Sequence, residues 1–222
     1  MNPPSPPPSR LAQWLVWGGL AVVMAGILAA FLLRRDQGRG GLAGSGPPEV
    51  LPVLFSIPDF ALTNQAGRVV TQSELRGRVW LADIIFTQCA GPCPEMTRRM
   101  AELQTALPAA MPVRFVTLTT DPVHDTPAVL AAYARRFGAQ AGRWEFLTGT
   151  KRQIAELAVK GLKLTALDKE PAQRENADDL FIHSTQFVLV DGRGQARAVF
   201  ESDDPGMESK VTTAVNRLLQ KK

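Results

Sequence analysis

The stretch "RVWLADIIFTQCAGPCPEMTRRMAELQTAL", residues 78–107, decides the fold. Its first part, residues 78–86, is a near-continuous apolar run of strand length, which is typical of a strand covered on both faces. Pro94 then begins a segment with helical spacing of its apolar residues. The two cysteines of the chain, Cys89 and Cys93, lie where the strand pattern gives way to the helix pattern.

The segments that follow alternate between strand and helix patterns: strand 113–121, helix 125–138, strand 143–149, helix 150–162, hairpin 185–200 and helix 206–220. Thr126 is a good N-cap for the helix that follows it. This order is typical of an α/β thioredoxin-like sandwich, in which helices flank a central mixed sheet. We expect that domain over residues 54–222.

The positive charge of the chain is concentrated before this domain. The formal net charge is +4, but residues 1–46 hold four arginines against one acidic residue, Asp36. From Pro47 onward, 21 basic residues face 20 acidic ones, and no basic stripe with interleaved aromatic residues occurs. We therefore expect no nucleic-acid binding.

Residues 11–33 contain no charged residue and predict a transmembrane anchor. At ~1.5 Å per residue the helix would be about 34 Å long, enough to cross a ~30 Å hydrocarbon layer. A cleaved signal peptide is the alternative, but its apolar core would be shorter and would end at a small-residue cleavage site. We expect a Pro-rich leader over 1–10, the anchor over 11–33 and a flexible linker over 34–53.

The charges around the anchor and the chemistry of the domain favour different orientations. Arg10 precedes the anchor while Arg34, Arg35 and Arg39 follow it, which by the positive-inside rule would place the domain in the cytoplasm. The short leader and the cysteine chemistry favour the outer face instead. We expect a single-pass inner-membrane protein with its C-terminal domain on the periplasmic side.

The cysteine pair allows three interpretations: a disulfide switch, a metal clamp or two buried structural thiols. If Cys89 and Cys93 were both helical, their Cα atoms would be ~6 Å apart, within the range of a disulfide. Both sulfurs would then lie near a helix N-terminus, which favours thiolate, the nucleophile of disulfide exchange and a soft ligand of Cu(I). Gly91-Pro92 between them predicts a formed loop and argues against two structural thiols.

The chain offers two histidines as further ligands. A closed zinc site would need both, and their spacing matches no zinc-finger pattern. His183 directly precedes the strand 186–190, whose start faces the cysteine loop in a thioredoxin-like sheet, so we expect it to be a ligand. His124 lies in the "DPVHDTP" stretch, where we expect it to be solvated, with Asp121 and Asp125 as turn and helix-entry residues.

The domain resembles the Sco/SenC family of membrane-anchored, thioredoxin-like copper proteins that assist cytochrome c oxidase assembly. Three stretches carry the resemblance: "PDFALTNQAGRVVTQSELRGRVWLADIIFTQCAGPCP", "DPVHDTP" followed by "AAYARRFG", and "HSTQFVLVDGRG". The resemblance implies that Cys89, Cys93 and His183 are the metal ligands, for Cu(I), Cu(II) or both. Many relatives carry acidic residues between the cysteines and before the histidine; here Ala90-Gly91-Pro92 and Ile182 make the site more apolar.

The resemblance predicts delivery of copper to the dinuclear copper centre of a haem–copper oxidase. The expected partners are the copper-site subunit of that oxidase, a copper donor and a thiol reductant. The alternative is a membrane-tethered thiol–disulfide oxidoreductase, in which Cys89 attacks a partner disulfide and Cys93 resolves the mixed disulfide. A peroxidase is a weaker third hypothesis, because peroxidatic cysteines follow a Thr-x-x-Cys pattern and this chain has Thr87-Gln88-Cys89.

Overall fold

The computed structural model describes residues 17, 19, 22–29, 50–173 and 181–220. The chain divides into two compact units, Met1–Glu49 and Val50–Lys222. In the first unit, the described residues are helical. Among the residues described, no helix is long and apolar enough to span a membrane. The predicted leader, much of the predicted anchor and residues 34–49 of the predicted linker lie outside the described residues.

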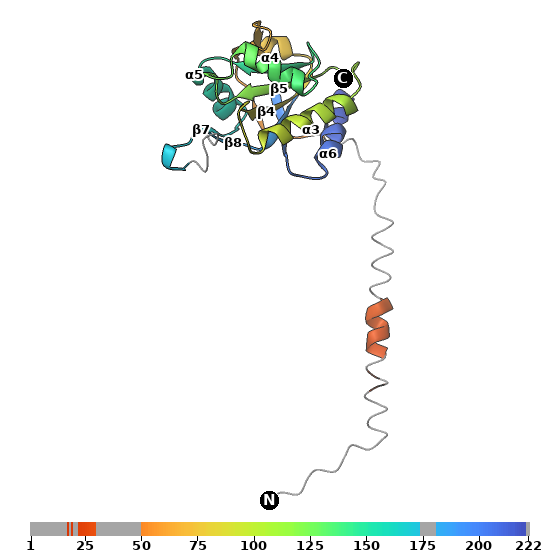
Figure 1. The fold of residues 1–222 in the computed structure, drawn as a ribbon. Coiled ribbons are helices and arrows are strands. Elements are labelled where there is room, and N and C mark those ends of the chain that lie inside the picture. The colour runs from red at the N-terminus through yellow and green to blue at the C-terminus, as the bar shows by residue number, and fades with distance from the viewer. Residues whose placement is uncertain (1–16, 18, 20–21, 30–49, 174–180, 221–222) are drawn as a thin grey trace, which may run out of the picture. The chain divides into compact units, whose positions relative to one another are not determined.

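The second unit is built on a mixed sheet with helices packed against it (Figure 1). Within the described residues this sheet has eight strands, in the order β1-β10-β9-β4-β5-β6-β2-β3. The strands are β1 Phe55–Ser56, β2 Ala61–Asn64, β3 Val69–Thr71, β4 Val79–Ile85, β5 Val113–Thr119, β6 Trp144–Thr148, β9 Gln186–Val190 and β10 Gln195–Glu201. β4, β5 and β6 run parallel to one another, and the other pairs are antiparallel. A separate two-stranded sheet joins β7 Ala166–Asp168 to β8 Phe181–His183.

Helices cover both faces of the large sheet, as the α/β sandwich predicts. They are α2 Gln72–Leu75, α3 Cys93–Ala106, α4 Pro127–Arg136, α5 Lys151–Ala155, the π-helix η1 Glu156–Gly161, the 3-10 turn η2 Pro171–Gln173 and α6 Met207–Leu219. One apolar core packs α3, α4 and α6 against the sheet, and a second core packs α5 and η1 against the opposite face.

β4 is buried along its whole length and contributes to both cores. Leu81 and Ile85 point into the core beneath α3, whereas Trp80 and Ile84 point into the core beneath α5. Side chains alternate across a strand, so a continuous apolar run is the pattern of a strand with two covered faces. The prediction of such a strand at 78–86 is confirmed.

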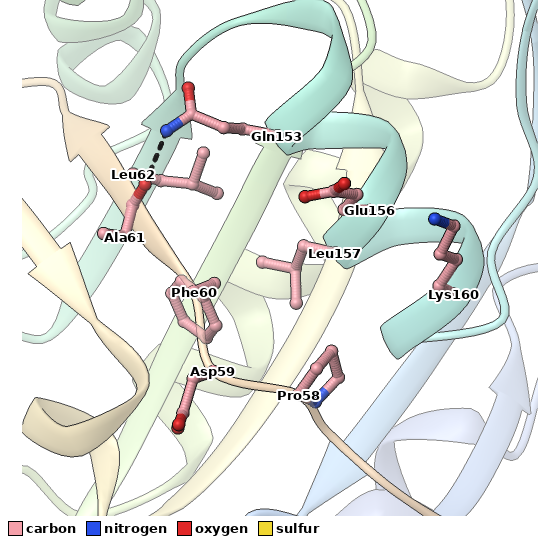
Figure 2. Close-up of a pocket in the computed structure, with 9 residues that line it drawn as sticks. All are labelled: Pro58, Asp59, Phe60, Ala61, Leu62, Gln153, Glu156, Leu157 and Lys160. Carbon is pink, nitrogen blue, oxygen red and sulfur yellow. Dashed lines mark hydrogen bonds between the residues drawn. The ribbon is translucent and has the colours of Figure 1, made fainter.

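The predicted helices differ from the structure at one segment, residues 150–162. α5 ends at Ala155 and the chain continues as the π-helix η1, in which the Leu162 N–H donates to the carbonyl of Leu157 at 2.8 Å. The wider turn brings Gly161 against Pro58, where an added Cβ would come within 3.0 Å of the proline ring. Pro58 and Leu157 are among the residues that line a surface pocket (Figure 2). The volume of this pocket is about 370 Å³.

The chain joins the sheet at its β1 edge, where Arg197 of β10 fixes the residues before β1. The Nε of Arg197 donates to the carbonyl oxygens of Leu51 and Pro52 at 3.1 and 3.0 Å. Its Nη1 forms an ion pair with Asp191 at 2.6 Å, and both side chains are about nine-tenths buried. Residues 51–54 are therefore attached to the edge of the sheet before the first strand begins.

Candidate metal and dithiol site

Cys93 is the first residue of α3 and is fully buried. Pro92 precedes it as the N-cap, and Pro94 follows within the first turn, where the missing N–H of proline costs no helical hydrogen bond. The Thr97 hydroxyl donates to the carbonyl of Cys93 at 2.9 Å. The Cys93 sulfur is thus fixed by the start of the helix.

Cys89 lies in the loop between β4 and α3 and is partly exposed. Its N–H donates to the carbonyl of Phe86 at 3.2 Å, and the Gly91 N–H donates to its sulfur at 3.4 Å. Gly91 precedes Pro92, a position that disfavours helical geometry, and it lies outside the helix, which begins at Cys93. The expectation of a formed loop is confirmed, whereas the interpretation that places both cysteines in one helix is wrong.

Asp125, which belongs to another part of the chain and is completely buried, holds the cysteine loop in place. Asp125 accepts hydrogen bonds from the N–H and the hydroxyl of Thr87 and from the hydroxyl of Thr119. The interpretation of Asp125 as a simple helix-entry residue therefore missed its role in holding the loop. Asp121 is a turn residue as expected, because it accepts the His124 N–H at 3.3 Å.

The side chain of His124 is 40% exposed, and its Nδ1 lies 3.0 Å from Asp125 Oδ1. This exposure agrees with the expectation of a solvated side chain. His124 is not among the residues that converge with the cysteines.

His183 reaches the cysteines from β8. Its strand pairs with β7, where Ala166 lies opposite His183, and the Ser184 N–H donates to the carbonyl of Thr165 at 3.2 Å. His183 Nδ1 lies 3.0 Å from the carbonyl oxygen of Ser184, so Nδ1 carries the hydrogen and Nε2 carries the lone pair. Nε2 lies 3.1 Å from the Cys93 sulfur, and the ring of Phe86 packs edge-on against the imidazole.

The two sulfurs and an imidazole nitrogen form a compact ligand set. The ligand atoms of Cys89, Cys93 and His183 all lie within 4.8 Å of one another. Two metal–ligand bonds of roughly 2.0–2.3 Å span at most ~4.6 Å, so these atoms could close on one ion with a shift of a few tenths of an ångström. Two thiolates and one imidazole suit Cu(I), and mixed N/S ligation also suits Cu(II).

The pKa values of the two thiols are shifted in opposite directions. The hydrogen bond with Cys93 is the largest cause that lowers the pKa of Cys89, to about 4, and His183 and the Gly91 N–H act in the same direction. Burial raises the pKa of Cys93, and the neighbouring Cys89 raises it further. At neutral pH the site therefore holds one thiolate and one thiol, which corrects the expectation that the helix N-terminus makes both sulfurs thiolates.

Asp83 is a residue of this site that the sequence analysis missed. It stands within the apolar run of β4, has no exposed surface, and neither carboxylate oxygen has a hydrogen-bond partner among the described residues. Burial raises its pKa to about 7. The charge of Asp83 also raises the pKa of Cys93. The sequence did contain a signal for this residue: an acidic residue inside a predicted buried strand, six positions before Cys89. Acidic residues are rarely buried without a partner, so such a position indicates a functional or structural role.

The fold and the site together define a class: thioredoxin-like domains in which a histidine joins the cysteine pair. The SCO1/SenC family model matches residues 55–220. The chain belongs to the SCO1/SenC family.

The SCO1 protein homolog of Bacillus subtilis is 37% identical over 146 residues, which cover 65% of this chain and 72% of that protein. A SCO1/SenC family lipoprotein from Bacillus anthracis is similar in structure, with a TM-score of 0.67 and 28% identity over 77% of this chain and 99% of that one. BsSco, described as a cytochrome c oxidase assembly protein with a disulfide switch, matches with a TM-score of 0.66 and 30% identity over 78% of this chain and 99% of that one.

Proposed function

We propose that this chain carries copper as cargo and delivers it to the dinuclear copper centre of a haem–copper oxidase. The observation that carries the proposal is the convergence of Cys89, Cys93 and His183 within 4.8 Å from two separate parts of the fold. BsSco, which shares 30% identity and the same fold, is a cytochrome c oxidase assembly protein, and this supports the same role here.

Each ligand is prepared differently for the ion. Cys89 is already a thiolate at neutral pH, because its pKa is lowered to about 4. Cys93 must lose its proton when the ion binds, since burial raises its pKa. His183 presents Nε2 because Nδ1 is held by the Ser184 carbonyl. Three protein ligands leave the ion open to a partner, so copper can pass on by ligand exchange without release to solvent.

The proposal places the domain beside the membrane on the periplasmic side, with residues 11–33 as its anchor. A tether raises the effective concentration of the domain near an oxidase in the same membrane without adding any contact. The copper-site subunit of the oxidase would be the acceptor, and a separate protein would donate the copper. A thiol reductant is also needed, because an empty cysteine pair tends to form a disulfide in the periplasm.

Copper titration of the reduced full chain in neutral detergent tests the binding step. We expect one copper ion per chain, held tightly enough to compete with a copper chelator. His183→Ala should weaken this binding at least ~100-fold, since an ion held by three ligands loses one of them. His124→Ala is the matched control, because this histidine lies outside the cluster, and should leave the affinity unchanged. Tight one-to-one binding by His183→Ala would contradict the proposal.

Transfer of the ion tests the delivery step. The copper-loaded chain should pass its ion to the copper-free domain of the oxidase copper-site subunit, measured by the copper absorbance that this domain gains. A copper-loaded chain that keeps its ion in the presence of that domain would argue against delivery.

A second function, thiol–disulfide exchange, is favoured by the low pKa of Cys89 beside the buried thiol of Cys93. In this reaction the Cys89 thiolate attacks a partner disulfide and expels one partner thiolate. Cys93 then loses its proton, attacks the Cys89 sulfur and expels the second thiolate, which leaves the partner reduced and the chain as a Cys89–Cys93 disulfide. An external thiol reductant would restore the pair. The disulfide switch of BsSco supports such a pairing.

His183→Ala separates the two functions. An oxidoreductase should retain disulfide exchange with a model disulfide after loss of the imidazole, whereas a copper carrier should lose its tight copper binding. Retained exchange in a variant that has lost both tight copper binding and the wild-type rate of copper transfer would show that exchange does not need the copper site; tight copper binding without His183 would show that His183 is not a ligand.

A further inference from the structure

A second site lies at the opposite end of the parallel strands from the cysteines. A cleft of about 440 Å³ is lined by Arg78, Arg114 and Arg143 and contains no acidic residue in its lining. Arg78 directly precedes β4, Arg114 follows the first residue of β5, and Arg143 directly precedes β6. Because these strands are parallel and the cysteine loop follows the far end of β4, the cleft is separated from the thiols by the length of that strand.

Arg143 forms the fixed wall of this cleft. It is only 7% exposed, and its two terminal nitrogens donate to the carbonyl oxygens of Gln104, Leu107 and Pro108 at 2.8, 2.7 and 3.2 Å. Its guanidinium also lies over the ring of Phe115, 5.5 Å from the centroid. Its buried Nε has no hydrogen-bond partner in the described part of the chain, so one donor of the group is unused.

Arg78 and Arg114 are the other two arginines that line the cleft. Both are partly exposed, and within the described residues neither side chain forms an ion pair or a hydrogen bond. Other arginines of the domain, such as Arg98 and Arg197, pair with carboxylates. Arg78 and Arg114 therefore line the cleft with guanidinium groups that have no partner in the described residues, and Arg143 lines it as a buried residue bonded to backbone carbonyls.

We propose that this cleft binds a phosphate-type oxyanion, either free phosphate or the phosphate of a lipid headgroup. The planar guanidinium group presents its N–H donors as a fork that matches the oxygens of a phosphate, and such charge-assisted bonds are stronger than neutral ones. A bound oxyanion would neutralise part of the charge that the three arginines concentrate in one cleft. This site is independent of copper, so the inference does not rest on the function of the cysteines.

Arginine-specific labelling of the full chain tests the proposal. Phenylglyoxal modifies exposed arginines, and mass spectrometry of the peptides gives the rate at each one. In neutral detergent we compare inorganic phosphate with chloride at equal ionic strength. In nanodiscs we compare phosphatidylcholine alone with phosphatidylcholine that contains phosphatidylglycerol. Arg135, an exposed arginine of α4 outside the cleft, is the internal control.

Protection of Arg78 and Arg114 by at least about threefold, with Arg135 unchanged, is the expected result. Protection by inorganic phosphate assigns the cleft to a free oxyanion, and protection in either kind of nanodisc relative to chloride in detergent assigns it to a headgroup. Equal rates in all four conditions overturn the proposal, as does equal protection of Arg135, which would indicate screening alone.

A variant measurement keeps the test separate from the copper site. Arg78→Gln/Arg114→Gln should lose the rise in thermal midpoint that phosphate gives the wild-type chain, yet bind one copper as the wild type does. An undiminished response to phosphate in this variant would also overturn the proposal.

Discussion

Cys89 stands in the loop after β4 and is partly exposed, whereas Cys93 begins α3 and is fully buried. Four residues apart, they meet different surroundings: Cys89 receives the hydrogen bonds of its neighbours, and Cys93 is enclosed by the core. Burial and hydrogen bonding therefore set the ionisation of a cysteine pair, while spacing alone does not. Four measurements can test this difference between the two cysteines.

The largest expected effect is the difference in alkylation between the two thiols. In the reduced full chain at pH 7, iodoacetamide should modify Cys89 at least ~1,000-fold faster than Cys93, because the thiolate is the reacting form and Cys93 is both protonated and buried. Since the pKa of Cys89 is lowered to about 4, its rate should stay constant from pH 8 to pH 5 and fall only as the pH passes through about 4. Peptide mass spectrometry measures both rates.

Cys93→Ala is the control for this contrast. It removes the largest cause of the lowered pKa, so the midpoint of Cys89 alkylation should rise toward the usual cysteine value of ~8.5. Similar rates at the two cysteines of the wild type, or a wild-type midpoint already near 8.5, would end the contrast.

The next test asks whether Cys89 owes its position to a side chain outside its own loop. Asp125→Ala leaves the N–H and hydroxyl of Thr87 and the hydroxyl of Thr119 without their acceptor. We expect the free energy of unfolding in urea to fall by about 3 kcal/mol, because buried donors left unpaired are costly. Asp121→Ala, which removes one 3.3 Å bond, should cost about 1 kcal/mol. Equal losses in the two variants would show that Asp125 does not hold the loop.

Asp83→Asn tests the buried carboxyl near Cys93. Its pKa is raised from 3.8 to about 7, so the unfolded chain releases this proton at lower pH than the folded chain does. The wild type therefore loses stability as the pH rises from about 4 to about 7, and asparagine cannot ionise. Between pH 5 and pH 8 the variant should gain roughly 2.5 kcal/mol relative to the wild type in urea unfolding. Parallel pH profiles of the two proteins would show that Asp83 is not perturbed.

The smallest effect is expected for Gly91→Ala. An added Cβ would lie 3.7 Å from the Cys89 sulfur, an ordinary contact, and the N–H that donates to this sulfur is retained. The free energy of unfolding should change by less than ~0.5 kcal/mol. The pH midpoint of Cys89 alkylation should stay at about 4. Gly194→Ala is the contrasting variant, because its φ is +76° and a Cβ would meet Gln72, so it should cost about 1–2 kcal/mol. A larger loss for Gly91→Ala would reveal an unrecognised constraint on the loop.

The parts of the fold that the sequence predicted are those with a strong local signal. The apolar run of β4, the helical spacing of α3 and the cap at Thr126 each depend on neighbouring residues, and the structure has them where expected. The placement of His183 beside the cysteines followed from the fold and from the resemblance, since 90 residues separate it from Cys93.

The missed features depend on contacts distant in sequence or on single residues that contradict their surroundings. Thr87 and Asp125 are 38 residues apart, and a turn pattern around Asp125 says nothing of that contact. Asp83 is one acidic residue in an apolar strand, so the dominant pattern conceals it. The wide turn at Gly161 lies against Pro58, which is far from it in the chain. The pKa values of the two cysteines required their three-dimensional neighbours.

The attachment of residues 51–54 by Arg197 has a mechanical consequence. Any tension transmitted along the preceding chain reaches the domain at β1, the outermost strand, which is separated from β4 by β10 and β9. The hydrogen bonds and the buried ion pair of Arg197 would bear such a load first. A pull on the preceding chain would therefore separate β1 from β10 first, and it would reach β4, the strand that leads into the cysteine loop, only after the ladders β10–β9 and β9–β4 had also opened.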